Sequence, residues 1–570
     1  MFLPSTKPIA TETTSRKCSP LRLHLNFSPI RGVQVRSQNR SRVAVTANKA
    51  QPTRILVVSS LLSSFFNMFE DIINRFTRSP LPTFIDPKHV LIGNFAPVDE
   101  LSPTNCQIIE GSLPSCLNGV YIRNGPNPQH FPTGSYHLID GDGMLHCLHI
   151  SDGHAMLYNH YVRTYRYNKE SETGRPVFPN MFSALYCPTT AFIRVVFTAA
   201  RILTGQINPA RGDGQANTSL AFFANRLFAL GESDLPYALR LNKAGEIETM
   251  GRYDFNGELL RNMTAHPKVD PDTGENFAFH HNLIYPFLTF FYFDSNGSKQ
   301  SNVPIFSLTQ HSLIHDFAIT KRFAIFPDIQ MGVNLMAILK GKPLMKLDLE
   351  KVPRIGVIPR YAKDESKMKW FDVPGLNFLH AINAWEEEDD VIVLIAPNML
   401  SIEHCLERME LNHASVEKVS IDLKTGVISR FPLSAKNLEF GVINPAFVGK
   451  KSRYAYMGVL EPMPKIVGLV KMDLSGWEHQ EHVVASRMYG EGCYGGEPFF
   501  VARNPGDLKA DEDDGYVVTY LHDEISGESK FLVMDAKSPS LEIVAVVKLP
   551  YRVPYGFHGL FVTESDLKKL

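Results

Sequence analysis

The stretch FHHNLIYPFLTFFYFDSNG, residues 279–297, decides the fold class of this sequence. Its apolar residues come in short runs of aromatic and branched side chains, and turn residues bound them, with Pro286 in the middle and DSNG at the end. Such runs between Gly, Pro, Asn and Asp are typical of β-strands joined by turns. We therefore assign β-structure to this stretch.

The same alternation of short apolar run and turn continues on both sides, over residues 90–570. It recurs in GVYIRNGPNP (119–128), SYHLIDGDGMLHCLHI (135–150), KRFAIFPDI (321–329), DDVIVLIAP (389–397) and KFLVMDAKSP (530–539). Alternation sustained over so long a chain favours blades around an axis over a single sandwich. The sequence carries no WD or kelch signature that would mark individual blades. We predict an all-β domain over residues 90–570.

Residues 181–204 interrupt the β pattern with the sequence MFSALYCPTTAFIRVVFTAARILT. The segment is apolar with helical spacing, while Pro188, Arg194 and Arg201 argue against a bilayer span. We interpret it as a helical cap over one end of the sheet structure. Its exposed apolar side chains are the expected place for contact with a lipid surface and for substrate access, and they are Phe182, Phe192, Ile193 and Phe197.

Residues 51–89 are predicted to hold a helix and a linker. Apolar side chains recur at intervals of three and four residues over 55–76, which predicts an amphipathic helix that is too polar to cross a membrane. Two positions for this helix remain open, in a membrane interface or docked on its own domain. Residues 79–87 contain three prolines and are predicted to be an extended linker.

The first 50 residues differ in composition from the rest of the chain. They contain nine Lys and Arg but one acid, Glu12, together with many Ser and Thr. This composition is typical of a plastid transit peptide, and the lack of an apolar core disfavours a secretory signal. A disordered tail without a targeting role is the alternative. Removing the +8 of this segment from the total of -1 leaves a body with a net charge near -9.

Composition and short motifs exclude several function classes. The net charge of -1 gives no general attraction to nucleic acid. Seven scattered cysteines without a Cys-x-x-Cys pair argue against zinc ribbons and disulfide frameworks. No GxGxxG, GKS or GKT motif occurs in a strand-to-helix context, which disfavours nucleotide binding, and the lack of a GxSxG motif disfavours the simplest hydrolases.

Four of the 20 histidines lie in apolar or turn segments at large separations. They are His266 in TAHPKVD, His315 in SLIHDFAIT, His380 in NFLHAINAW and His558 in YGFHGLF. Equivalent positions on the innermost strands of different propeller blades all face the central axis, so these four rings are expected to meet there. Four neutral imidazoles suit a divalent transition metal such as iron and leave coordination positions open. A structural zinc would more commonly recruit cysteine.

A ligand imidazole needs its second N–H oriented, usually by a carboxylate. Three glutamates lie in apolar segments and are the predicted partners: Glu232 in LFALGESDLPY, Glu439 in NLEFGVINP and Glu497 in YGGEPFFV. His280 and His281 also form a tempting pair, but neighbours on a strand point to opposite faces. At most one of them can face a site, and we leave both out of the ligand set.

With these motifs in order, residues 90–570 resemble the carotenoid cleavage dioxygenase (carotenoid oxygenase) family. The resemblance is carried by NFAPVDELSP, GVYIRNGPNP, HLIDGDGMLH, AHPKVDP, HDFAIT, NAWEEED, GGEPFFV and FHG. The LIGNFAPVDELSP and SLPSCLNGVYIRNGPNPQ segments resemble the plastid class-4 enzymes of plants most. The resemblance implies a seven-bladed propeller with a helical dome over the iron face, and one Fe²⁺ held by His266, His315, His380 and His558. It also implies three supporting glutamates, Glu232, Glu439 and Glu497.

The same resemblance implies that the protein uses O2 to cleave a conjugated double bond of a carotenoid, giving aldehyde or ketone products. The expected bond is 9,10 (9',10'), with 7,8 (7',8') and then 11,12 of an epoxycarotenoid as alternatives. Cleavage of a stilbene-like alkene and isomerisation without oxygen are further uses of such a site. A propeller that binds carotenoid without turnover is the alternative from another class. We expect a plastid location, with peripheral association to a membrane or plastoglobule.

Overall fold

The structure is a computed structural model, and it describes residues 64–69, 71–72, 81–184, 188–334, 345–476, 481–507 and 509–570. The chain divides into two compact units, Met1–Val58 and Ser59–Leu570. The predicted transit peptide, residues 1–50, lies outside the described residues. The described helices and strands all belong to the second unit.

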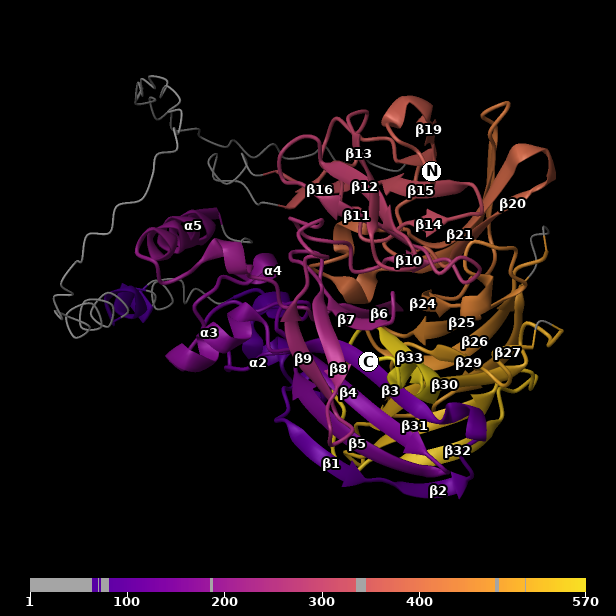
Figure 1. Ribbon diagram of the computed structural model, residues 1–570, viewed down its shortest axis with the longest axis horizontal. Coiled ribbons are helices and arrows are strands. Elements are labelled where there is room, and N and C mark those ends of the chain that lie inside the picture. The colour runs from indigo at the N-terminus through magenta and orange to yellow at the C-terminus, as the bar shows by residue number, and fades with distance from the viewer. Residues whose placement is uncertain are drawn as a thin grey trace, which may run out of the picture. The chain divides into compact units, whose positions relative to one another are not determined.

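Most of this unit consists of antiparallel sheets built from strands that follow one another along the chain (Figure 1). The first four-stranded sheet contains β6 (Ser219–Phe223), β7 (Arg226–Leu230), β8 (Tyr237–Leu241) and β9 (Ile247–Arg252). The second contains β10 (Lys268–Val269), β11 (Asn276–His281), β12 (Leu288–Phe293) and β13 (Lys299–Ile305). β11 and β12 cover the stretch that decided the fold class, and they pair antiparallel.

Two more four-stranded sheets follow. One contains β14 (Ala318–Ile319), β15 (Phe323–Asp328), β18 (Arg354–Pro359) and β19 (Lys369–Asp372), with a separate hairpin of β16 (Met331–Val333) and β17 (Met345–Leu347) inserted in it. The other contains β20 (Asn383–Glu387), β21 (Val391–Met399), β22 (Ala414–Asp422) and β23 (Ile428–Pro432). Each sheet thus uses local pairings, which short turns between apolar runs favour.

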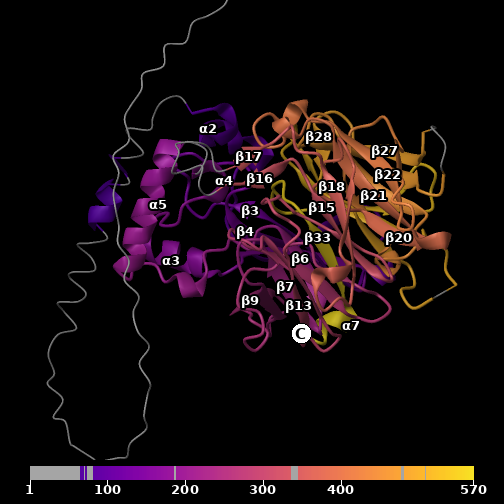
Figure 2. The ribbon, with the colours of Figure 1, turned by 90° about the horizontal axis from the view of Figure 1, so that it is seen from above.

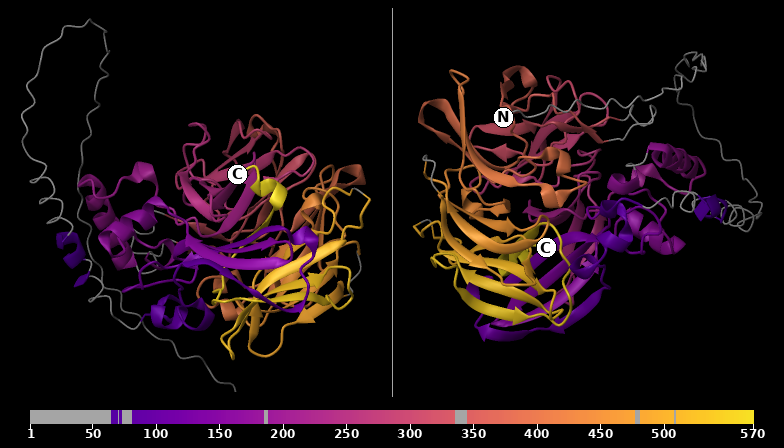
Figure 3. Two further views of the ribbon diagram at one scale, coloured as in Figure 1. Left: turned by 60° about the horizontal axis from the view of Figure 1, so that its bottom comes forward. Right: turned by 180° about the vertical axis from the view of Figure 1, so that it is seen from behind.

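The two ends of the described chain are joined through the remaining sheets (Figure 3). A five-stranded sheet contains β1 (Leu101–Asn105), β5 (His154–Tyr161), β4 (Asp142–Ser151), β3 (Gly119–Asn127) and the late strand β33 (Gly559–Thr563). A ten-stranded sheet contains the early strand β2 (Gln107–Gly111) with β24 (Leu438–Val442), β25 (Tyr454–Leu460), β26 (Ile466–Asp473), β27 (Val483–Met488), β28 (Cys493–Gly495), β29 (Phe499–Ala502), β30 (Gly515–Asp523), β31 (Ser529–Asp535) and β32 (Ile543–Lys548). The predicted all-β character of the domain is confirmed.

Apolar clusters between neighbouring sheets form the core. Between the first two sheets, for example, the rings of Phe255 and Phe293 stack with centroids 4.1 Å apart, and Phe223 lies 5.8 Å from Phe293. All three side chains are buried. Burial of this kind on both faces of a sheet explains why its strands are apolar along most of their length, without strict alternation.

Helices gather beside the sheets in one region (Figure 2). They are α3 (Tyr165–Thr173), α4 (Met181–Ala184) and α5 (Pro188–Leu203), so the helix predicted over 181–204 is confirmed, with residues 185–187 outside the described part. The remaining helical elements are α2 (Pro87–Val90), α7 (Glu564–Leu567) and the 3-10 turns Thr83–Ile85, Gly93–Phe95, Ser115–Leu117, Pro209–Arg211, Glu365–Lys367, Glu388–Asp390, Ile402–His404, Met409–Leu411 and Pro445–Phe447. In the part of the chain that the structure describes, no helix is long and apolar enough to span a bilayer.

The segment before the sheets departs from the prediction. Residues 64–69 and 71–72 are helical, and the rest of the helix predicted over 55–76 lies outside the described residues. The predicted linker over 79–87 is not extended throughout, because a 3-10 turn forms at Thr83–Ile85 and α2 begins at Pro87. The carboxylate of Asp86 accepts a hydrogen bond from the Lys88 amide and caps α2, and proline is well tolerated at the first position of a helix.

The pairing of β33 with β3 generates a stability prediction. Val562 is 2% exposed and lies opposite Val120 in this pairing. Val562→Ala removes buried methyl groups from the strand that ties the end of the chain to its beginning, and should lower the free energy of unfolding by about 2 kcal/mol. Val427→Ala, at a valine that is 64% exposed, is the control and should change it by less than about 0.5 kcal/mol. Equal effects of the two substitutions in thermal unfolding would contradict this role for β33.

Candidate metal centre

Four histidines occupy equivalent positions in four different sheets. His266, His315, His380 and His558 each lie within three residues before a strand, and these strands are β10, β14, β20 and β33. β10, β14 and β20 are each the first strand of their sheet in the sequence. The chain therefore turns into each sheet at the same end, which explains how residues far apart in sequence converge.

The four imidazoles form one cluster. One ring nitrogen from each lies within 4.8 Å of the others, and Nε2 of His266 is 3.0 Å from Nε2 of His315. The ring of His266 is 4.6 Å from that of His558 and 5.3 Å from that of His380, measured between centroids. The structure thus brings together all four histidines that the sequence singled out.

The three predicted glutamates bind the outer nitrogens of three of these rings. Nδ1 of His380 is 2.9 Å from Oε2 of Glu439, and Nδ1 of His558 is 2.8 Å from Oε1 of Glu497. Nδ1 of His315 also bonds Oε1 of Glu232. A carboxylate accepts hydrogen bonds only, so each of these Nδ1 atoms carries a proton and each Nε2 is the atom left to face the cluster.

Burial and neighbouring charges set the protonation of the cluster. Burial, together with the three other imidazoles, lowers the pKa of His266 well below its usual range, which keeps that ring neutral. Burial also lowers the pKa of His380, but the carboxylate of Glu439 outweighs it and raises this pKa to about 9. Burial raises the pKa of Glu439, but the His380 ring lowers it, and the net effect is a lowered pKa. A metal cation must displace the inward proton of His380, so acid opposes metal binding.

The donor set fits a transition metal ion. Nε2 of His380 is buried and has no hydrogen-bond partner, although it faces three other imidazoles. An unsatisfied nitrogen in such a place indicates a ligand atom rather than a packed core histidine. Four nitrogen donors without a carboxylate in the set suit iron among the common divalent metals, and leave room for further ligands.

A buried carboxylate that sequence reasoning missed connects three of the ligand segments. Oδ2 of Asp316 accepts hydrogen bonds from the backbone amide of Ala381 at 2.9 Å and from Nζ of Lys268 at 3.0 Å. Asp316 follows His315 directly, Ala381 follows His380 directly, and Lys268 is two residues beyond His266. The Asp316 side chain is 3% exposed. Its place in the HDFAIT motif was the available signal, but its partners are distant in sequence.

His281 also supports the site from outside the ligand set. Its Nε2 bonds the backbone carbonyl of Ile314, the residue before His315. Its neighbour His280 contacts the ring of Phe291 instead, with centroids 5.8 Å apart. The prediction that at most one of this pair can face the site agrees with this arrangement.

Two neighbouring cavities lie near the cluster. The lining of the first includes Glu497, Phe440 and Phe557. The Phe440 ring lies 5.8 Å from His380 and 5.9 Å from His558. The second cavity shares four lining residues with the first: Val90, Phe95, Leu138 and Pro464. The first cavity is thus a largely apolar space beside two of the histidines.

The residues predicted to contact lipid divide into two groups. Phe192 and Ile193 on α5 are 46% and 38% exposed. Phe197 is half-buried because the rings of Phe66 and Phe69 pack on it at 6.0 and 5.6 Å. Phe182 is half-buried, and its ring lies 5.9 Å from that of His137.

Known proteins resemble this chain over nearly its whole length. The family described as retinal pigment epithelial membrane protein matches residues 95–563. A protein of Arabidopsis thaliana named "Probable carotenoid cleavage dioxygenase 4, chloroplastic" is 59% identical over 97% of this chain and 96% of its own length. The "Zeaxanthin 7,8(7',8')-cleavage dioxygenase, chromoplastic" of Crocus sativus is 54% identical over 64% of this chain and 99% of its own.

A more distant relative and a solved structure extend the comparison. The "Carotenoid 9,10(9',10')-cleavage dioxygenase 1" of Phaseolus vulgaris is 38% identical over 85% of this chain and 91% of its own. The crystal structure of lignostilbene dioxygenase from Pseudomonas brassicacearum matches with a TM-score of 0.71 at 23% identity, over 85% of this chain and 99% of that one. At 23% identity, this structural match indicates a shared fold only.

The contacts of Asp316 predict that it positions metal ligands. Asp316→Asn keeps the size of the side chain but removes the charge that holds Lys268, and should weaken Fe²⁺ binding by about tenfold in a competition assay with a chelator. Asp272→Asn removes an acid whose side chain is 67% exposed and is the charge-matched control. The thermal unfolding of the metal-free variants separates a loss of ligand positioning from a loss of stability. Unchanged Fe²⁺ affinity in Asp316→Asn would refute the positioning role.

Proposed function

This chain belongs to the carotenoid oxygenase family, and we propose that it is an O2-dependent dioxygenase that cleaves a conjugated double bond of a carotenoid. The observation that carries the proposal is the cluster of four imidazoles, within 4.8 Å of one another, beside an apolar cavity. The names of the two plant relatives above that are more than half identical to this chain are consistent with it.

We propose that the sheets are seven blades of a propeller. Four sheets of four strands and the five-stranded sheet account for five blades. The ten-stranded sheet supplies two, because its halves are joined through β26 and β28 at a single residue pair, Ile466 with Gly495. The equivalent positions of the four histidines support this arrangement, with α3, α4 and α5 as the helical dome.

In the proposed mechanism, one Fe²⁺ per chain is held by His266, His315, His380 and His558. Bound iron supplies the activation of O2, so that one oxygen atom is added to each carbon of the broken double bond and no external reductant is required. Glu232, Glu439 and Glu497 hold the Nδ1 protons of three rings, as their hydrogen bonds indicate. Phe440 borders the reaction space, and the apolar lining keeps the polyene in place and limits access of water.

For the bond position we propose 9,10 (9',10'). The 9,10-cleaving relative shares 38% identity over most of this chain. Cleavage at 7,8 (7',8') is the second candidate, and the 54% identity to the Crocus enzyme favours it. The products distinguish them, because 9,10 cleavage leaves the methyl-bearing C9 on the ring fragment as a ketone, whereas 7,8 cleavage leaves C7 there as an aldehyde.

Turnover of carotenoids in detergent under air tests this proposal. The iron-loaded protein should release a ring-bearing ketone, identified by mass spectrometry, and His315→Ala should lose at least about 100-fold in rate while still folding. His154→Ala, at an exposed histidine of β5, is the control and should retain the activity. A ring-bearing aldehyde that ends at C7 would select the 7,8 position, and one that ends at C11 would select the 11,12 position. Tight carotenoid binding without any product would favour a non-catalytic carotenoid carrier.

We further propose that the protein acts in a plastid, with residues 1–50 as the transit peptide, and associates peripherally with a membrane or plastoglobule. The chloroplastic and chromoplastic names of the two plant relatives support the plastid location. Exposed apolar side chains on two packed helices support the lipid contact. They are Phe65, Met68, Phe69 and Ile72 on one helix, and Phe192, Ile193, Val195 and Val196 on α5.

Charged substitutions on this surface should release the protein from lipid. Phe192→Asp together with Val196→Asp places two carboxylates on side chains that are 46% and 49% exposed, and should reduce vesicle binding by at least about tenfold in a flotation assay. Ile284→Asp, at a residue that is 78% exposed on the β11–β12 turn, is the matched control and should bind normally. Equal flotation of both variants would place lipid contact elsewhere.

A further inference from the structure

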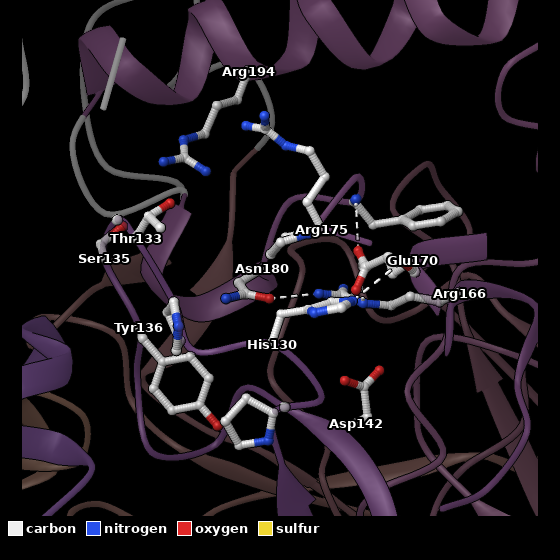
Figure 4. A pocket seen from close by; sticks show the side chains of 16 residues that line it. His130, Thr133, Ser135, Tyr136, Asp142, Arg166, Glu170, Arg175, Asn180 and Arg194 are labelled. Carbon is white, nitrogen blue, oxygen red and sulfur yellow. Dashed lines mark hydrogen bonds and ion pairs between the residues drawn. The ribbon is translucent and has the colours of Figure 1, made fainter. Parts of the chain in front are cut away.

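A polar pocket lies under helix α5 (Figure 4). Among its lining residues it shares only Tyr136 with the cavity beside the histidines. Three arginines from different parts of the chain line it: Arg166 on α3, Arg175 just after α3, and Arg194 on α5. Figure 4 shows the Arg194 side chain extending from α5 toward the pocket.

The internal contacts of the pocket leave donors unused. Arg166 is 6% exposed, and its terminal nitrogens bond the carbonyl of Pro179 at 3.2 Å and Oδ1 of Asn180 at 2.6 Å. Its Nε is buried without a hydrogen-bond partner, as is Nε of Arg175. A terminal nitrogen of Arg175 pairs with Asp71 at 2.8 Å. Buried polar atoms in native proteins normally have partners, so unused donors in a pocket indicate a ligand.

Two acids, Glu170 and Asp142, also line the pocket. Oε1 of Glu170 already accepts hydrogen bonds from the amides of Val177 and Phe178, each at 2.9 Å, and lies 3.7 Å from Nε of Arg166. Oδ1 of Asp142 is buried and has no hydrogen-bond partner. Asp71, outside the lining, pairs with Arg175, so what the pocket offers a ligand is the unused Nε donors of Arg166 and Arg175 rather than a net charge. The pocket therefore suits an anion, and Asp142 provides an acceptor for a hydroxyl on the same ligand.

The position of the pocket connects it to the lipid-facing surface. Arg194 lies between Ile193 and Val195 on α5, which are 38% and 48% exposed. One helix thus presents apolar side chains outward and a guanidinium group to the pocket. At the rim, Thr133 is exposed, and nearby Phe131 is 59% exposed. A molecule whose apolar part lies against α5 can place a polar end among the arginines.

We propose that this pocket binds the headgroup of an anionic lipid, a phosphate or sulfonate that also carries hydroxyl groups. The inference rests on the proposed membrane association and adds a preference for lipid charge to it. A body with a net charge near -9 is repelled overall by an anionic surface, so such a preference requires a local site. Apolar contact through α5 would supply attachment, and the pocket would select the membrane and orient the cavity mouth on it.

Flotation with two kinds of vesicle tests the proposal. Wild-type protein is mixed with vesicles of phosphatidylcholine alone, or with one part in five replaced by phosphatidylglycerol. The anionic vesicles should bind more protein, and Arg194→Gln should lose this gain, by about fivefold in partition coefficient, while binding to neutral vesicles is unchanged. Arg240→Gln makes the same charge change at an arginine whose side chain is 51% exposed in a surface ion pair, and should keep the gain.

Two further measurements make the result decisive. Thr133→Glu places a negative charge at the exposed rim without touching α5 and should remove the same gain if Arg194→Gln proves unstable in thermal unfolding. Calorimetric titration with glycerol 3-phosphate examines the pocket without a membrane and should show weak binding that Arg194→Gln removes.

Each outcome bears on a definite claim. A gain that persists in both pocket variants overturns the headgroup site. Binding of glycerol 3-phosphate without any preference among vesicles overturns the lipid assignment and leaves a site for a free anion. If wild-type protein binds no vesicles at all, the proposed membrane association fails, and the titration still reports separately on the pocket.

Discussion

The site depends on one constraint: four imidazole rings from four sheets must point the same nitrogen at one centre. A neutral imidazole can do this only if its other nitrogen is held as a donor, and Glu232, Glu439 and Glu497 hold three of them in this way. Glu439 and Glu497 are buried in the packed core, and the Glu232 side chain is 26% exposed. The chemistry of the centre therefore extends several residues beyond the ligands.

The packing of the sheets holds the four imidazole rings in these positions. Each histidine precedes a strand, and each strand is fixed by antiparallel pairing and by apolar clusters between sheets. Asp316 adds a direct link, because one carboxylate holds groups next to three of the four ligands. The pairing of β3 with β33 matters for the same reason, since it fixes the strand that follows His558 to the beginning of the domain.

Functions that require contact with other molecules lie outside this rigid part. The helices α3 and α5 and the segment around Phe66 carry the exposed apolar side chains and the arginine-lined pocket. Between them and the metal centre lies Tyr136, which lines both the polar pocket and the inner cavity. The proposed lipid contact and the proposed headgroup site are thus neighbours of the inner cavity, and each has its own chemistry. The proposed enzyme could in this way take an apolar substrate directly from a membrane.

The sequence by itself determined the all-β class, the helix over 181–204, and the identity of the four histidines and three glutamates. Strand periodicity and turn residues are local properties of the chain. The joint pattern of His and Glu in apolar segments is likewise visible in the linear sequence. It also placed Arg194 in that helix, but not what the side chain faces. Only the tertiary structure decided which side chains meet. Asp316 contacts Ala381 and Lys268, Phe66 packs on Phe197, Phe182 lies beside His137, and Arg194 meets Arg166 and Arg175 around one pocket. These are contacts between residues far apart in sequence, and they are fixed by the packing of whole sheets and helices, about which a local pattern carries no information.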